Sequence, residues 1–334
     1  MAYEPESGLV AGTDGDERVA AVIVDAPPVT ECAQELGVPT FRFADDSSSA
    51  APSGGIQTVW HGVDHPEGVA VANDGVVWCG GEEGQIYRAQ LRDQPRELCR
   101  LPGRPLGFAI DPSGDAYCCV YLDACGLYRL SQNGDYVLVS AGTEERPVNT
   151  PNHPVLLASG DVLFSDSGDW GSENGCVYAV DRSGSTRVFD ETCRSFPNGL
   201  ALSADGRTLA IVESTLPGVS TLTVRSDGTA GSRTPVLMTP GMVPDGIAYD
   251  SRWGLLVSFW VPDAIIHVTA DGDCTVIASD PFRFQLNQPT NIAFVPGTAT
   301  VVVANIGERF LSVFEHSGPG PAFQSPDLAA TSSR

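Results

Sequence analysis

The segment Gly199–Ser214 reads GLALSADGRTLAIVES, and an earlier segment, Gly68–Gly81, reads GVAVANDGVVWCGG. Each consists of a run of small and β-branched residues, a turn that ends in Asp-Gly, and a second apolar run. Asp-Gly between two apolar runs is typical of a β-hairpin. Both segments open on the glycine of a Pro-x-Gly triplet, Pro66-Glu67-Gly68 and Pro197-Asn198-Gly199. They therefore predict two copies of one repeated hairpin unit.

Six such units follow one another along the chain. Their prolines stand at positions 66, 105, 151, 197, 244 and 289, at spacings of 39, 46, 46, 47 and 45 residues. A period in this range indicates a propeller or a solenoid, and short strands separated by turns favour an all-β propeller. Only three apolar runs follow the last proline, so residues 56–60 are expected to supply the fourth strand and close the ring. We predict a six-bladed β-propeller over residues 56–316, a partly disordered extension over 1–55 and a disordered tail over 317–334.

The residue that follows each of these prolines is the strongest functional signal. In chain order these residues are Glu67, Leu106, Asn152, Asn198, Asp245 and Thr290. Equivalent positions of all blades converge on the propeller axis, so the carboxylates and amides of Glu67, Asn152, Asn198 and Asp245 are expected to meet there. Such oxygen donors suit a hard dication, and Ca²⁺ is the cation that we expect. Mg²⁺, Mn²⁺ and Zn²⁺ remain alternatives, although zinc more often takes histidine or cysteine.

The composition excludes several classes of partner. The chain of 334 residues carries a formal net charge of −23, which argues against nucleic acid and against an anionic membrane surface. No run of 18 apolar residues is present, so no membrane span is expected. All 19 basic residues are arginines, which excludes lysine chemistry. We therefore expect a small-molecule substrate; the oligomeric state is left open.

The cysteines and the N-terminus bear on the cellular compartment. The nine cysteines include no C-x-x-C pair, and several lie in strand-like runs, where cysteine acts as a small hydrophobic residue. The first residues are acidic and polar, without the apolar core of a signal peptide. These features predict reduced cysteines in the cytoplasm.

Several segments also resemble the SMP-30/gluconolactonase/LRE family of six-bladed, metal-dependent hydrolases and lactonases. The resemblance covers roughly residues 60–315 and is carried by HPEGVAV (65–71), FSDSGDWGSENGCVYAVDRSG (164–184), FPNGLALSADGRTLAIVEST (196–215), VPDGIAYDSRWGLLVSFW (243–260) and QPTNIAFVPG (288–297). In that family a Glu, two Asn and an Asp hold the axial metal, which matches Glu67, Asn152, Asn198 and Asp245. Residues 103–130 are also similar to strictosidine-synthase-like propellers, a neighbouring group whose synthases lack the full metal set.

The resemblance implies a hydrolase of lactone or ester type, in which the metal polarises a carbonyl and Asp245 serves as ligand and as general base or nucleophile. His153, beside a ligand position, is a candidate for proton transfer or substrate contact. Asp166, Trp170 and Trp260 are candidates for the substrate pocket.

The chain departs from the family pattern at two positions. His153 stands where an aspartate is common, and Thr150 stands where some lactonases carry an arginine. Sugar-lactone binding is therefore open. Two alternatives remain: a biosynthetic enzyme that uses the same metal for ring formation, ring opening or isomerisation, and a non-catalytic binding propeller tied together by the ion.

Overall fold

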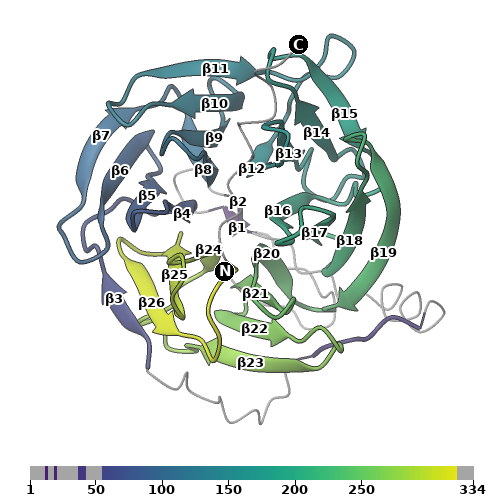
Figure 1. The fold of residues 1–334 in the computed structure, drawn as a ribbon. Helices are drawn as coiled ribbons and strands as arrows, with labels where there is room; N and C mark the ends of the chain where they lie inside the picture. The colour runs from purple at the N-terminus through teal and green to yellow at the C-terminus, as the bar shows by residue number, and fades with distance from the viewer. Residues whose placement is uncertain (1–11, 14–18, 21–36, 43–54, 322–334) are drawn as a thin grey trace.

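Six four-stranded antiparallel sheets surround one axis, which confirms the predicted six-bladed propeller (Figure 1). The computed structural model describes residues 12–13, 19–20, 37–42 and 55–321. Within these ranges every regular element is a strand, and there is no helix long and apolar enough to cross a membrane. Most of the predicted N-terminal extension lies outside the described residues, as does the tail from 322 onward.

Each blade begins with an inner strand near the axis and continues outward. Blade one contains β4 (Val69–Val71), β5 (Val76–Gly80), β6 (Gln85–Gln90) and β7 (Arg96–Arg100). Blade two contains β8 (Arg104–Ile110), β9 (Ala116–Tyr121), β10 (Gly126–Leu130) and β11 (Tyr136–Ser140). Blade three contains β12 (Pro151–Leu156), β13 (Val162–Asp166), β14 (Cys176–Val180) and β15 (Thr186–Asp190).

The second half of the ring follows the same order. Blade four contains β16 (Pro197–Leu202), β17 (Thr208–Glu213), β18 (Gly218–Val224) and β19 (Ala230–Met238). Blade five contains β20 (Val243–Tyr249), β21 (Leu255–Val261), β22 (Ala264–Val268) and β23 (Cys274–Ser279). Blade six contains β24 (Pro289–Phe294), β25 (Thr300–Asn305), β26 (Leu311–Glu315) and β3 (Gln57–Val59). Outside the blades, β1 (Gly12–Thr13) pairs antiparallel with β2 (Val19–Ala20).

The ring closes through β3, which pairs antiparallel with β26, as the sequence predicted. Blade six thus takes its outer strand from the start of the propeller sequence, which leaves no free edge at the seam. The ordered chain also continues past the predicted end of the propeller at residue 316. The amide of Ser251 donates to the carbonyl of Pro319 (3.1 Å), and Gly320 donates to Thr298 (3.0 Å).

Part of the N-terminal extension packs on the outer edge of blade four. Thr40 forms a parallel bridge with Met238 at the outer edge of blade four, and Phe41 donates to the same residue (2.9 Å). The Phe41 side chain packs against the apolar cluster between blades four and five. This segment covers part of an edge strand that would otherwise be open.

Apolar side chains between neighbouring blades form the core. Leu163 and Val177 of blade three, for example, pack with Leu200 and Ile211 of blade four. The strands next to the inner ones are buried on both faces, which explains why their sequences read as continuous apolar runs rather than alternating ones. Full burial of one such side chain contributes roughly 1.5–3 kcal/mol.

All six inner strands run in the same direction along the axis, which gives the channel two distinct ends. The Pro-x-x triplets stand where the inner strands begin, and we call this end the anchor face. The opposite ends of the strands surround a cavity of ≈ 320 Å³ lined mainly by apolar residues of all six blades, among them Val71, Leu156, Leu202, Tyr249 and Phe294. We call this end the far face.

Candidate metal centre at the anchor face

We call the residue after each blade proline an anchor: Glu67, Leu106, Asn152, Asn198, Asp245 and Thr290. Glycines that follow four of these anchors let the inner strands approach one another closely. A side chain at Gly68 would overlap the carbonyl oxygen of Leu106 in the next blade, and one at Gly246 would overlap that of Thr290. A Cβ at Gly199 would lie 2.5 Å from the carbonyl oxygen of Asp245. The repeated glycine therefore reflects close backbone packing around the axis.

Hydroxyl groups link the anchors of neighbouring blades. The Thr290 hydroxyl donates to the Glu67 carbonyl (2.8 Å), which joins blade six to blade one. Ser165 on β13 donates to the carbonyl of Asn198 (2.7 Å), and Ser214 donates to that of Pro244 (2.7 Å). Together with the glycine contacts, these bonds hold the starts of neighbouring inner strands against one another. Convergence of the four ligand side chains on one point remains a prediction.

Three side-chain oxygens of these anchors are buried and without a hydrogen-bond donor among the described residues: Asn152 Oδ1, Asn198 Oδ1 and Asp245 Oδ1. The amide nitrogen of Asn198 donates to Ser214 Oγ (3.2 Å) and to Asp245 Oδ2 (3.3 Å), which leaves its oxygen free to accept. A buried polar atom without a partner costs about 1–3 kcal/mol. Three such acceptors from three blades match the donor set that a hard cation requires.

The burial and mutual repulsion of the Glu67 and Asp245 carboxylates also favour a bound cation. Burial raises the pKa of Asp245 well above its usual range, and the negative charge of Glu67 raises it further, against the opposing hydrogen bond from Asn198. Burial also raises the pKa of Glu67, opposed by the positive charge of Arg104. Two carboxylates that are poorly solvated and repel each other would be stabilised by a cation between them.

His153 occupies the place that glycine holds after four of the other anchors. It is 8% exposed, and a Cβ at Gly107 of the preceding blade would lie 2.5 Å from its Nδ1. Burial lowers the pKa of His153 to about 4, although the nearby Asn291 side chain favours the charged form. The imidazole is therefore neutral at pH 7. Its buried Nδ1 has no partner among the described residues and remains available for a hydrogen bond.

The three residues predicted for the substrate pocket occupy different environments. Asp166 is buried at the end of β13, where its carboxylate accepts hydrogen bonds from the amides of Asn149 (3.1 Å) and Thr150 (2.6 Å). These bonds give Asp166 a structural role in holding the loop before the third anchor. Trp170 is half-buried, with its ring edge-on to Phe196 at 4.8 Å. Trp260 is half-buried near the end of β21. Substrate contact by all three remains a prediction.

Sequence reasoning did not identify Arg104, whose guanidinium lies beside the first anchor. Its Nε is 3.7 Å from Glu67 Oε2, and its Nη1 is 3.4 Å from Glu82. Arg104 immediately precedes the blade proline Pro105, so a scan of the residue before each blade proline could have found it. Asn291, which lies near His153, follows the sixth anchor Thr290 and could have been found in the same way.

Comparisons with known proteins agree with this architecture. A family model described as the SMP-30/Gluconolactonase/LRE-like region matches residues 61–304. A gluconolactonase from Xanthomonas campestris is 18% identical, with a TM-score of 0.68 over 82% of this chain and 93% of that one. The calcium-binding protein regucalcin from Agrobacterium tumefaciens is also 18% identical, with a TM-score of 0.64 over 86% of this chain and 99% of that one.

The fold is shared with an enzyme of another reaction class. Virginiamycin B lyase from Staphylococcus aureus is 17% identical, with a TM-score of 0.56 over 78% of this chain and 99% of that one. A search of curated protein sequences found no match. At these identities the solved structures support the fold, and the activity has to be argued from the site.

Proposed function

Because the chain belongs to the SMP-30/Gluconolactonase/LRE-like family, we propose that it is a metal-dependent hydrolase of lactone or ester type that acts on a small molecule in the central channel. The observation that carries this proposal is the set of three buried, unpartnered oxygens contributed by Asn152, Asn198 and Asp245. Glu67 adds a second carboxylate whose ion-pairing neighbour, Arg104, is 3.7 Å away.

Glu67, Asn152, Asn198 and Asp245 would hold the cation, and Ca²⁺ best suits four oxygen donors. A dication bound there would polarise the carbonyl oxygen of a substrate. The chain's own residues would orient the substrate and move the proton. Asp245 Oδ2 is already engaged by the amide of Asn198, whereas Oδ1 is the free acceptor. We propose that Asp245 acts as general base or nucleophile.

His153 is the second residue that we propose for proton transfer. Its neutral imidazole can accept a proton from water or donate a hydrogen bond to a leaving oxygen. Its close packing against Gly107 fixes the position of the ring. Its pKa of about 4 makes it a weak base in the metal-free protein. Hydrogen bonding to substrate is therefore the role that the present geometry supports more strongly.

We also propose that the protein works in the cytoplasm. The eight cysteines within the described ranges are free, and burial raises the pKa of Cys79, Cys118 and Cys119 well above the usual range. Such buried thiols are unreactive, which fits a packing role in a reducing compartment.

A panel of lactones and esters, assayed with and without a chelator, tests the proposed reaction. Elemental analysis of the purified protein should be made on the same sample. We expect hydrolysis of at least one substrate class, loss of that activity after chelation and recovery with Ca²⁺. A protein that binds the cation but hydrolyses nothing on the panel would favour the non-catalytic binding propeller.

A further inference from the structure

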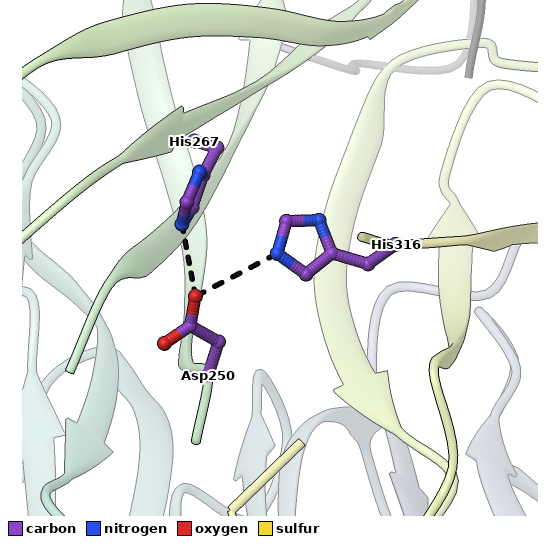
Figure 2. A group of neighbouring side chains, drawn as sticks. All are labelled: Asp250, His267 and His316. Atoms are coloured by element: carbon purple, nitrogen blue, oxygen red, sulfur yellow. Dashed lines mark hydrogen bonds and ion pairs between the residues drawn. The ribbon is translucent and has the colours of Figure 1, made fainter. Parts of the chain in front are cut away.

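Two of the five histidines in the chain meet one aspartate, away from the anchor ring. Asp250 follows β20 at the far face, His267 lies on β22 of the same blade, and His316 follows β26 in blade six. Their nitrogen and oxygen atoms lie within 4.8 Å of one another. Figure 2 shows both imidazoles directed at the Asp250 carboxylate from two sides. We propose that these three residues bind a transition-metal dication, with Zn²⁺ as the probe, which ties blade five to blade six.

The geometry is intermediate between a hydrogen-bonded cluster and a metal site. His267 Nε2 lies 2.9 Å from Asp250 Oδ2, which is a good hydrogen bond. His316 Nε2 is 3.6 Å from the same oxygen, which is too long for one. Ligand atoms of a tetrahedral zinc site with bonds of about 2.0–2.1 Å lie roughly 3.3 Å apart. His267 Nε2 would thus have to move away from Asp250 Oδ2 by about 0.4 Å, and His316 Nε2 would have to approach it by about 0.3 Å. Rotation of the imidazoles can supply shifts of this size.

The carboxylate is already fixed in an orientation that suits a ligand. Asp250 Oδ1 accepts the amides of Arg252 (2.7 Å) and Gly254 (2.8 Å), so that Oδ2 remains for the imidazoles. Backbone bonds of this kind commonly orient metal-binding carboxylates. Gly254 also makes room for the cluster, because a Cβ there would lie 2.7 Å from Asp250 Oδ2 and would overlap His267 Nε2.

Hydrogen bonds at Asp250 and burial at His316 favour the forms of these two residues that bind metal. The side chains of Asp250 and His316 are each 3% exposed, whereas His267 is 16% exposed and leaves a route to solvent. Burial raises the pKa of Asp250, but the two backbone bonds and His267 outweigh it, and the pKa lies below its usual value. Burial, followed by the charge of His267, lowers the pKa of His316. A carboxylate with a neutral imidazole is the ligand state that zinc requires.

The position of His316 gives the site a structural purpose. Its amide donates to the carbonyl of Ala299 (2.8 Å), which fixes it to blade six, and its ring packs against Phe294 at 6.0 Å. Blade six is the blade that closes the ring through β3. A metal bound to His316 and to two residues of blade five would therefore brace the blade on which closure depends.

Zinc binding to the full-length protein tests this proposal. With Ca²⁺ present in excess to occupy the anchor face, we expect one Zn²⁺ to be retained per chain after dialysis. At Zn²⁺ one hundred times above its dissociation constant, the melting temperature should rise by about 4 °C. His267→Gln and His316→Gln should each lose the retained zinc and the rise. His61→Gln, which removes an exposed histidine elsewhere, should keep both.

Three outcomes would overturn the site. Wild-type protein that retains no zinc would leave the cluster as a hydrogen-bonded group around the Asp250 carboxylate. Equal retention by wild type, His267→Gln and His316→Gln would place the zinc elsewhere. Loss of zinc in Asn198→Ala would place it at the anchor face. If His316→Gln does not fold, the more exposed His267 carries the test.

Discussion

The anchor face and the Asp250 cluster at the far face bring polar side chains together in different ways. At the anchor face each residue comes from the same position of a different blade, and three oxygens have no partner within the described chain. At the far face the residues come from a turn, a strand and a strand end, and one pair is already hydrogen-bonded. Repetition of one position therefore brings together acceptors that lack a hydrogen-bond donor. Local packing instead builds a cluster in which one pair is already hydrogen-bonded.

Among the substitutions that distinguish the anchor face from the Asp250 cluster, Asp245→Asn is expected to have the largest effect on activity. The amide keeps an oxygen near the axis but loses the charge and the base or nucleophile, so kcat/KM for hydrolysis should fall by about 10³-fold. Removal of a buried charge whose pKa is raised should leave the metal-free fold at least as stable. Zinc retention at the far face should be unchanged. Steady-state kinetics and thermal melts measure these quantities, and full activity would remove Asp245 from the chemistry.

His153→Ala tests whether the departure from the family pattern contributes to the reaction. If His153 moves a proton or binds the substrate, kcat/KM should fall by about 10²-fold while Ca²⁺ affinity changes little. Steady-state kinetics measures kcat/KM, and calorimetric titration of Ca²⁺ into the same preparation measures the affinity for the ion. Normal turnover would make His153 a packing residue beside Gly107.

Gly68→Ala tests the close approach of the inner strands. The added methyl group would overlap the Leu106 carbonyl, a backbone atom that cannot move aside without shifting its strand. The free energy of unfolding should decrease by about 2 kcal/mol. Gly318→Ala is the matched control, because a Cβ there would meet only the Arg252 side chain at 3.8 Å. Equal denaturation midpoints for the two variants would contradict the tight anchor ring.

The smallest effect is expected for Arg104→Gln. The guanidinium lies near Glu67, so its positive charge opposes a cation at the axis. Removing one positive charge about 6 Å from a dication should tighten Ca²⁺ binding roughly tenfold, if the two charges interact through the dielectric constant of water. Weaker binding would instead mean that Arg104 positions the Glu67 carboxylate.

The period of the sequence explains how much could be predicted. The spacing of the prolines predicted six blades. Because only three apolar runs follow the last proline, the sequence also predicted that the strand before the first blade, β3, completes the sixth. The anchor residues could be aligned because the fold repeats them. Asp250, His267 and His316 occupy unrelated places in their blades, so no period relates them. The backbone bonds of Asp166 depend on the path of one loop, which its Asp-rich sequence does not specify.

Crystals grown with Ca²⁺ provide the most direct test of the central claim, that four blades converge on one cation. Side-chain oxygens of Glu67, Asn152, Asn198 and Asp245 should lie within ~2.3–2.6 Å of a single ion. Leu106 and Thr290, at the equivalent positions of blades two and six, should not contact it. An ion bound only elsewhere would contradict this convergence, as would oxygens separated by more than about 8 Å, far beyond ligand distances.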